Sequence, residues 1–175
     1  MRQRQQSGFT MIEVLVTIAI LVVGLLGLAA MQTLATLAEL EAYQRSQAIV
    51  LVRDMADRMS ANKANIGSYM IQNSGLTYVS CAGLVGAELD KCEWNNLLNG
   101  NSEKADSGTR NVGAMIGARG CVAPLDAVTF QVTVAWQGLS RAGIPIEQCG
   151  AGAYGNDEQR RTVSTIVRIA LLAAP

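Results

Sequence analysis

The sequence predicts an α+β fold in which one long N-terminal helix, its first half spanning a membrane, packs on a small antiparallel β-sheet, with a short second helix. Three observations support this prediction. The stretch 14–38 contains 25 consecutive residues without a charge. Apolar residues then continue at helical spacing to Ala61, and apolar and polar residues alternate with period two in the last third of the chain.

The N-terminus separates into a basic leader and an apolar stretch. Residues 1–8 are polar, with Arg2 and Arg4 as their charged members, and the chain becomes apolar from Phe9. The uncharged stretch exceeds the roughly 20 residues that a helix needs to cross the hydrocarbon core. Because basic residues stay on the cytoplasmic side, we expect a single-pass inner-membrane protein with its C-terminal domain in the periplasm. The predicted segments are a leader, 1–8, a long helix, 9–61, with its membrane-spanning part at about 14–38, and a periplasmic globular domain, 62–175.

Glu13 lies at the start of the apolar stretch, where a carboxylate is unusual. An ordinary secretory signal peptide places its basic region directly before a short apolar core and ends in an A-x-A-like site, which this N-terminus does not do. A charged group in a membrane segment is costly and normally marks a function. Glu13 alone also fits an interfacial residue at the end of a signal anchor, so its meaning depends on the residues around it.

The helix is predicted to continue beyond the membrane, because residues 32–61 contain neither glycine nor proline. Apolar residues there follow helical spacing and charged residues take the opposite side, so one face packs on the domain and the other meets water. Gly24 and Gly27 are the weakest positions of the helix, each costing about 1 kcal/mol relative to alanine. The apolar positions are Ile49, Val52, Met55, Ala56 and Met59, and the charged ones are Arg45, Arg53, Asp54, Asp57 and Arg58.

The rest of the chain predicts one short helix and three strands, from Gly and Asn clusters and from period-two alternation. In chain order the expected elements are a loop at 62–85, a helix at 87–98 that stops at Asn99-Gly100, a loop at 100–120, a short strand at 119–123, a strand at 128–136, a turn at 137–145 and a last strand at 163–172.

Composition argues against an enzyme and against a nucleic-acid-binding protein. The chain has no histidine, which removes the commonest general base and the commonest metal ligand. Neither a nucleophile–base set nor a convincing carboxylate pair is present, so we expect no catalytic residue, no metal and no cofactor. Basic and acidic residues number 14 each, and Arg160-Arg161 is the only basic cluster, which does not suggest a nucleic-acid partner.

The four cysteines all follow the apolar stretch. They are Cys81, Cys92, Cys121 and Cys149. An even number in a small exported domain favours two disulfides. A zinc site needs closely spaced C-x₂₋₄-C pairs, whereas the intervals here are 11, 29 and 28 residues. Free structural thiols remain the alternative.

The residues Gly8-Phe9-Thr10-Met11-Ile12-Glu13-Val14-Leu15 resemble the prepilin processing motif of the type IV filament superfamily. Gly-Phe-Thr alone is common, but its combination with a short basic leader, a following glutamate and a long uncharged stretch is specific. The resemblance implies a type IV pilin-like fold. It also implies cleavage by prepilin peptidase between Gly8 and Phe9, followed by N-methylation of Phe9.

The resemblance further implies a role for Glu13, which becomes the fifth residue of the mature chain. In the family, this glutamate is thought to meet the N-terminal amine of a neighbouring subunit, here that of Phe9. An ionised carboxylate in hydrocarbon is unfavourable unless it is paired. Such a pair would offset the desolvation of both groups and set the axial register, while the apolar helices form the filament core.

Three later segments resemble the minor pilin family PilV. They are 55–62, at the end of the long helix, 89–98, in the second helix, and 132–137, in the central strand. Considered singly, Asp57 and Arg58 also fit solvated surface. The large apolar residues Met55, Met59, Trp94 and Trp136 also fit a core.

Two features depart from many major pilins. The chain has Ala30 where a proline is common, and it lacks a close C-terminal pair of cysteines. Cys121 and Cys149 instead bracket the central strand. We expect the pairs Cys81–Cys92 and Cys121–Cys149, although four cysteines allow three pairings.

The resemblance to PilV implies a minor pilin that initiates pilus assembly with other minor pilins and remains at or near the tip. Its implied partners are prepilin peptidase, other minor pilins and the major pilin, the inner-membrane assembly platform and membrane lipid; a tip adhesin is an open question. After assembly the protein would lie in the pilus at the cell surface. Two alternatives stay open, a minor pseudopilin of type II secretion and a signal-anchored periplasmic enzyme or binding protein.

Overall fold

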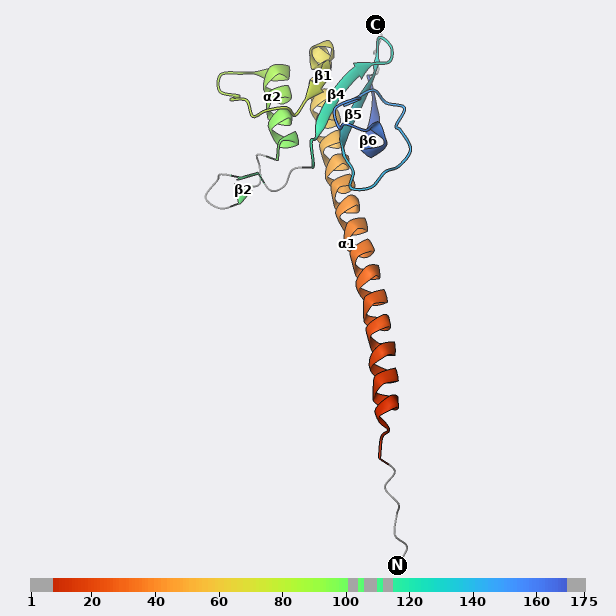
Figure 1. Cartoon of the computed structure of the whole chain (residues 1–175). Coiled ribbons are helices and arrows are strands. Elements are labelled where there is room, and N and C mark those ends of the chain that lie inside the picture. Colours follow the sequence, from red (N-terminus) through yellow and green to blue (C-terminus); the bar gives the residue numbers. More distant parts are fainter. Residues whose placement is uncertain (1–7, 101–103, 106–109, 112–114, 170–175) are drawn as a thin grey trace, which may run out of the picture. The chain divides into compact units, whose positions relative to one another are not determined.

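A computed structural model describes residues 8–100, 104–105, 110–111 and 115–169, so Arg2 and Arg4 of the predicted leader lie outside the described residues (Figure 1). The chain divides into two compact units, one ending at Leu40 and the other beginning at Glu41. Helix α1, Met11–Ala61, contributes to both units, and the other elements belong to the second.

The long helix was predicted to begin at Phe9, whereas α1 begins two residues later, at Met11. It runs without interruption through Gly24 and Gly27. The carbonyl oxygen of Thr10 accepts its first hydrogen bonds, from the N–H groups of Glu13 and Val14. Up to Leu40 the described side chains of the helix are exposed on all sides. From Glu41 onward the helix is amphipathic and buries one stripe, which consists of Gln44, Ala48, Val52, Met55 and Met59.

The second unit contains a four-stranded antiparallel sheet with strand order β1-β4-β5-β6. Its strands are β1 Ile71–Ser74, β4 Arg119–Pro124, β5 Thr129–Gln137 and β6 Arg160–Arg168. The other described elements are the 3₁₀-helix η1 Lys63–Tyr69, helix α2 Gly86–Leu98, the paired strands β2 Lys104–Ala105 and β3 Arg110–Asn111, and the 3₁₀-helix η3 Asp157–Gln159.

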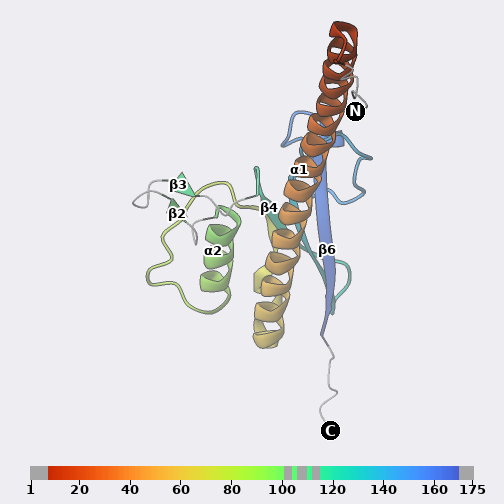
Figure 2. The ribbon, with the colours of Figure 1, turned by 90° about the horizontal axis from the view of Figure 1, so that it is seen from below.

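One face of the sheet carries the main core. Alternate residues of β5 enter this core together with the buried stripe of α1 and with Trp94 and Leu98 of α2. The indole N–H of Trp94 donates to the carbonyl oxygen of Leu51, 2.9 Å away, which ties α2 to the second-unit part of α1. Figure 2 shows α2 beside this part of α1. The β5 residues in the core are Phe130, Val132, Val134 and Trp136.

The predicted α+β architecture is confirmed, and three segments need correction. The stretch 100–120, predicted as a loop, contains the short paired strands β2 and β3 among its described residues. The 62–85 stretch, predicted as mainly loop, contains η1 and the edge strand β1. Strand β1 has only one large apolar residue, Ile71, so it lacks the alternation that identifies a strand. The last strand begins at Arg160, three residues earlier than predicted, and the predicted Leu171 and Leu172 lie outside the described residues.

Gly120 in β4 lies where the indole ring of Trp94 crosses the sheet. A Cβ atom at Gly120 would be 2.3 Å from two ring carbons of Trp94 and 2.6 Å from Cδ1 of Leu98. Both contacts are far shorter than van der Waals contact, and both neighbours are almost fully buried. The absence of a side chain at Gly120 therefore allows α2 to pack on the sheet.

We predict that Gly120→Ala destabilises the second unit by about 1–3 kcal/mol or more, because overpacking forces Trp94 out of its position. Denaturant unfolding of the full chain in detergent, followed by tryptophan near-UV circular dichroism, measures this change. Gly143→Ala is the matched control, since no atom lies within 4 Å of a Cβ at that position. Equal stability of the two variants would contradict the assignment.

Candidate functional site

The predicted processing residues lie at the start of α1. Gly8 and Phe9 precede the helix, and Phe9 is 84% exposed. Glu13 is exposed in the first helical turn, where a carboxylate interacts favourably with the positive end of the helix dipole. Within the single chain, the structure brings no other charged group to Glu13 among the described residues.

The apolar side chains of α1 up to Leu40 are not covered by the described residues of their own unit. Every described side chain from Gly8 to Leu40 is exposed, including those of Leu21, Val23 and Leu26. Among the described residues, α1 is the one helix that is long and apolar enough to cross a membrane. A surface of this kind needs a nonaqueous environment, either lipid or other apolar helices.

A charged cluster joins the end of α1 to α2 within the second unit. The guanidinium of Arg58 donates to Asp54, 2.9 Å away, to Asp90, 3.1 Å away, and to Glu93, 2.6 Å away. The phenol of Tyr69 also donates to Asp90. Arg58 therefore links α1 to α2. From the sequence alone, it could equally have been a solvated surface residue.

Electrostatics in this cluster favour the charged form of Arg58. Partial burial lowers the pKa of Arg58, but the neighbouring Glu93, Asp54 and Asp90 outweigh that effect and raise the pKa above its ordinary value. Burial, followed by the hydrogen bond to Asp90, raises the pKa of Tyr69. Asp90 thus acts as an acceptor for both Arg58 and a neutral phenol at physiological pH.

A second polar cluster fixes the 138–143 loop to α1 within the second unit. A carboxylate oxygen of Glu41 accepts from the N–H of Ser140, 3.0 Å away, and from its hydroxyl, 2.7 Å away. The hydroxyl bond is the largest of the effects that lower the pKa of Glu41. Arg161 lies 3.5 Å from Glu41 and donates to the carbonyl oxygen of Ser140.

The four cysteines form two disulfides, Cys81–Cys92 and Cys121–Cys149. The first joins the loop before α2 to α2 itself. Asn95 and Asn96 hold the same loop by hydrogen bonds to main-chain groups of Gly75, Thr77 and Val79.

The Cys121–Cys149 disulfide covers the outer face of the sheet. It packs with Ala135, and the sulfur of Cys149 lies 3.7 Å from the carbonyl oxygen of Thr133. This contact buries Thr133 and Ala135, which the period-two pattern of β5 places away from the main core.

The structure keeps the predicted residues in separate places. The processing residues lie in the first unit, whereas the disulfides and the Arg58 cluster lie in the second. Among the described residues, no group of three or more Cys, Asp or Glu side chains could hold a metal ion. The exposed apolar side chains of α1 and the exposed charged side chains of the second unit are surfaces suited to contact with lipid or with other proteins.

Two family models match adjoining parts of the chain. The model of the prokaryotic N-terminal methylation motif matches residues 3–29, and the model described as Type IV pilin Tt1218 matches residues 30–90. Together they extend from residue 3, within the predicted leader, to the middle of α2. No curated protein and no solved structure matches the chain.

We predict that Arg58→Met lowers the free energy of unfolding by about 1–3 kcal/mol, because it removes three hydrogen bonds between charged groups and leaves Asp90 and Glu93 without their cation. Thermal or denaturant unfolding in detergent measures the change. Arg53→Met, an exposed position on the same helix, is the control and should stay within about 0.5 kcal/mol of the parent chain. A similar loss in both variants would assign the effect to the helix and not to the cluster.

Proposed function

From the premise that this chain belongs to the type IV pilin superfamily, we propose that it is a minor pilin of the PilV kind. With other minor pilins it initiates filament assembly at the inner membrane, and it stays at or near the pilus tip. Proteins of this superfamily are structural, and the chain serves as the substrate of an enzyme once, during maturation.

The observation that carries the proposal is the uncovered apolar surface of α1. Its side chains are exposed on all sides up to Leu40, so the described part of the chain does not bury them. Lipid can cover this surface before assembly, and the helices of neighbouring subunits can cover it in a filament. One surface therefore suits both a membrane-anchored precursor and a polymerised subunit.

Removal of the leader allows the membrane-anchored precursor to become a polymerised subunit. Prepilin peptidase cleaves after Gly8 on the cytoplasmic side and methylates the new N-terminus at Phe9. Gly8 has no contact within 4 Å of a Cβ position and precedes the helix, which leaves the backbone free to lie extended in a protease cleft. Cleavage converts the main-chain nitrogen of Phe9 into a positive amine, four residues before Glu13 in sequence.

Glu13 then pairs with the Phe9 amine of a neighbouring subunit. Both groups enter an apolar environment, where an unpaired charge is costly and a pair offsets that cost. The pair sets the axial position of one helix relative to the next.

The PilV assignment within the superfamily rests on the second unit. Segments 55–62 and 89–98, which resemble PilV, contain Arg58, Asp90 and Glu93 and meet in the charged cluster. This cluster and Trp94 fix α2 beside α1 and thereby shape the surface that partner pilins and the assembly platform contact. The second unit lies in the periplasm before assembly and on the filament afterwards.

We predict that the Glu13→Ala variant is cleaved at the normal site, but that its amount in filaments falls by about tenfold or more. The substitution leaves the Phe9 amine of the neighbouring subunit without a partner. Intact mass of the membrane-bound chain reports the Phe9 terminus and its methylation, and immunoblots of sheared pili report incorporation. Glu39→Ala, an exposed carboxylate on the same helix beyond the uncharged stretch, is the control and should be incorporated normally. Incorporation of Glu13→Ala at the parent level would exclude the pairing.

Deletion of the gene separates a pilus role from a type II secretion role, since a minor pseudopilin shares the leader, the helix and the glutamate. We predict loss of surface pili and twitching with normal export of secreted proteins, scored in the same cultures. Normal pili with exoproteins retained in the periplasm would assign the chain to secretion. An unprocessed terminus in the intact mass would instead favour a signal-anchored periplasmic protein.

A further inference from the structure

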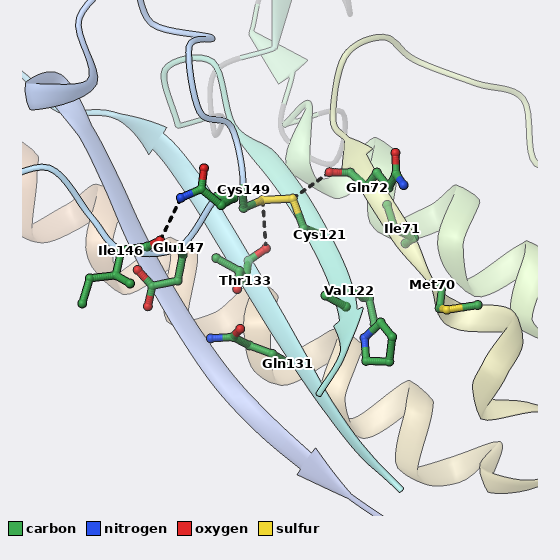
Figure 3. Close-up of a pocket in the computed structure, with 13 residues that line it drawn as sticks. Met70, Ile71, Gln72, Cys121, Val122, Gln131, Thr133, Ile146, Glu147 and Cys149 are labelled. Atoms are coloured by element: carbon green, nitrogen blue, oxygen red, sulfur yellow. Dashed lines mark hydrogen bonds between the residues drawn. A yellow bond between two sulfur atoms is a disulfide. The ribbon is translucent and has the colours of Figure 1, made fainter. Parts of the chain in front are cut away.

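A groove lies on the outer face of the sheet, away from the main core, and encloses about 830 Å³. Its lining residues extend from Ile146 and Glu147 across Thr133 and Cys121 to the start of β1, as Figure 3 shows. Its volume falls within the roughly 300–1,000 Å³ of ligand-binding pockets. The groove is confined to the second unit and crosses strands β5, β4 and β1.

The two walls of the groove present apolar side chains to solvent. Ile146 is 92% exposed on one wall, and Met70 is 55% exposed on the other. The floor between them contains the Cys121–Cys149 disulfide and Ala123. Apolar walls of this kind gain free energy when another molecule covers them.

The wall that carries Ile146 is held rigidly. Arg160, which is 1% exposed, donates from its guanidinium to the carbonyl oxygens of Glu147, Cys149 and Pro145 and to the carboxylate of Asp157. The disulfide to Cys121 fixes the same loop to β4. A preorganised wall reduces the ordering cost of binding, so the exposed Ile146 suits recognition.

Among the described residues that line the groove, Glu147 is the only ionisable one, apart from the disulfide-bonded cysteines. Its carboxylate accepts hydrogen bonds from the hydroxyl groups of Thr162, 3.0 Å away, and Ser164, 3.3 Å away. Its own main-chain N–H, these two hydroxyls and nearby Arg160 lower the pKa of Glu147, so the group is ionised at neutral pH. Within the described part of the chain, Glu147 forms no ion pair, because the donors of Arg160 are directed to carbonyl groups and to Asp157.

Two side-chain carboxamides in the groove have unused hydrogen-bond donors and acceptors. The side chains of Gln72 and Gln131 line the groove and make no hydrogen bond within the described residues. Each carboxamide can donate two hydrogen bonds and accept others, which matches the alternating N–H and C=O groups of a polypeptide main chain. A main chain lying across the sheet can therefore pair with both.

We infer that the groove binds an extended polypeptide segment of a partner protein, in which a lysine or arginine is flanked by aliphatic residues. The cation pairs with Glu147, the main chain pairs with Gln72 and Gln131, and the aliphatic side chains cover Ile146 and Met70. The charge of the groove favours a basic segment over an acidic one. This inference concerns the second unit and does not depend on whether the filament is a pilus or a secretion pseudopilus.

Peptide binding to the full mature chain in lipid nanodiscs tests the inference, with empty nanodiscs as the blank. The probes are two fluorescent capped hexapeptides, Val-Thr-Val-Lys-Val-Thr and the same peptide with Glu in place of Lys. We expect saturable binding of the lysine peptide, with an affinity about fivefold higher than that of the glutamate peptide. A difference of this size is what one partly exposed ion pair contributes to binding. Glu147→Gln should remove this preference, and Ile146→Ala should weaken both peptides without affecting the fold, since Ile146 is 92% exposed.

Glu88→Gln is the matched control, because Glu88 is an exposed carboxylate on α2 that does not line this groove. It should leave both affinities unchanged, and tryptophan near-UV circular dichroism should be the same for all variants. Absence of saturable binding at millimolar peptide, equal affinity for the two peptides, or an unchanged preference in Glu147→Gln would each overturn the inference.

Discussion

The constraint on which the rest of the structure depends is that one continuous helix must serve two environments. Up to Leu40 the side chains of α1 are predominantly apolar, uncharged from Val14 to Ala38, and exposed all round. From Glu41 the same helix is amphipathic and buries only the stripe that contains Ala48, Val52 and Met55. A helix that is apolar all round is stable only when lipid or protein surrounds it, whereas a helix with one apolar stripe can lie on a domain in water. The change in pattern near residue 40 therefore separates the part that other molecules must cover from the part that the domain covers.

The second unit is small, and its main core lies on one face of the sheet only. A core of this size gives limited stability, so covalent and polar contacts have a large share in holding the domain together. The Cys121–Cys149 disulfide closes a loop of 28 residues on the opposite face, where it can contribute about 3.6 kcal/mol by restricting the unfolded chain. The Arg58 cluster and the indole N–H of Trp94 add polar contacts that fix α2, a helix of 13 residues, to α1.

Sequence reasoning predicted the elements whose signal is local. The uncharged stretch of α1, the alternation of β5 and the glycine after α2 each lie within one segment, and Gly100 does end α2 with a positive φ of 69°. Strand β1 was not predicted because it exists through pairing with β4, almost 50 residues later, and not through its own composition. The partners of Arg58 were not predicted for a similar reason, since Asp90 and Glu93 are 32 and 35 residues away. A spacing of three residues places both carboxylates on one face of α2, but only the fold shows that this face meets α1.

The groove illustrates the same limit and explains why its surface is arranged as it is. Met70, Cys121 and Ile146 come from three separate segments, so no sequence pattern places them together. In the sequence, Arg160 is simply one member of the basic pair Arg160-Arg161, yet the fold buries it and uses it to hold the Ile146 wall. A buried guanidinium costs desolvation, and three carbonyl oxygens and a carboxylate are needed to offset it. A loop required only to connect two strands would not need this many partners, and it could turn Ile146 toward the sheet instead of toward solvent. The combination of a rigid loop with an exposed apolar side chain is therefore better explained by contact with another chain than by the stability of this one.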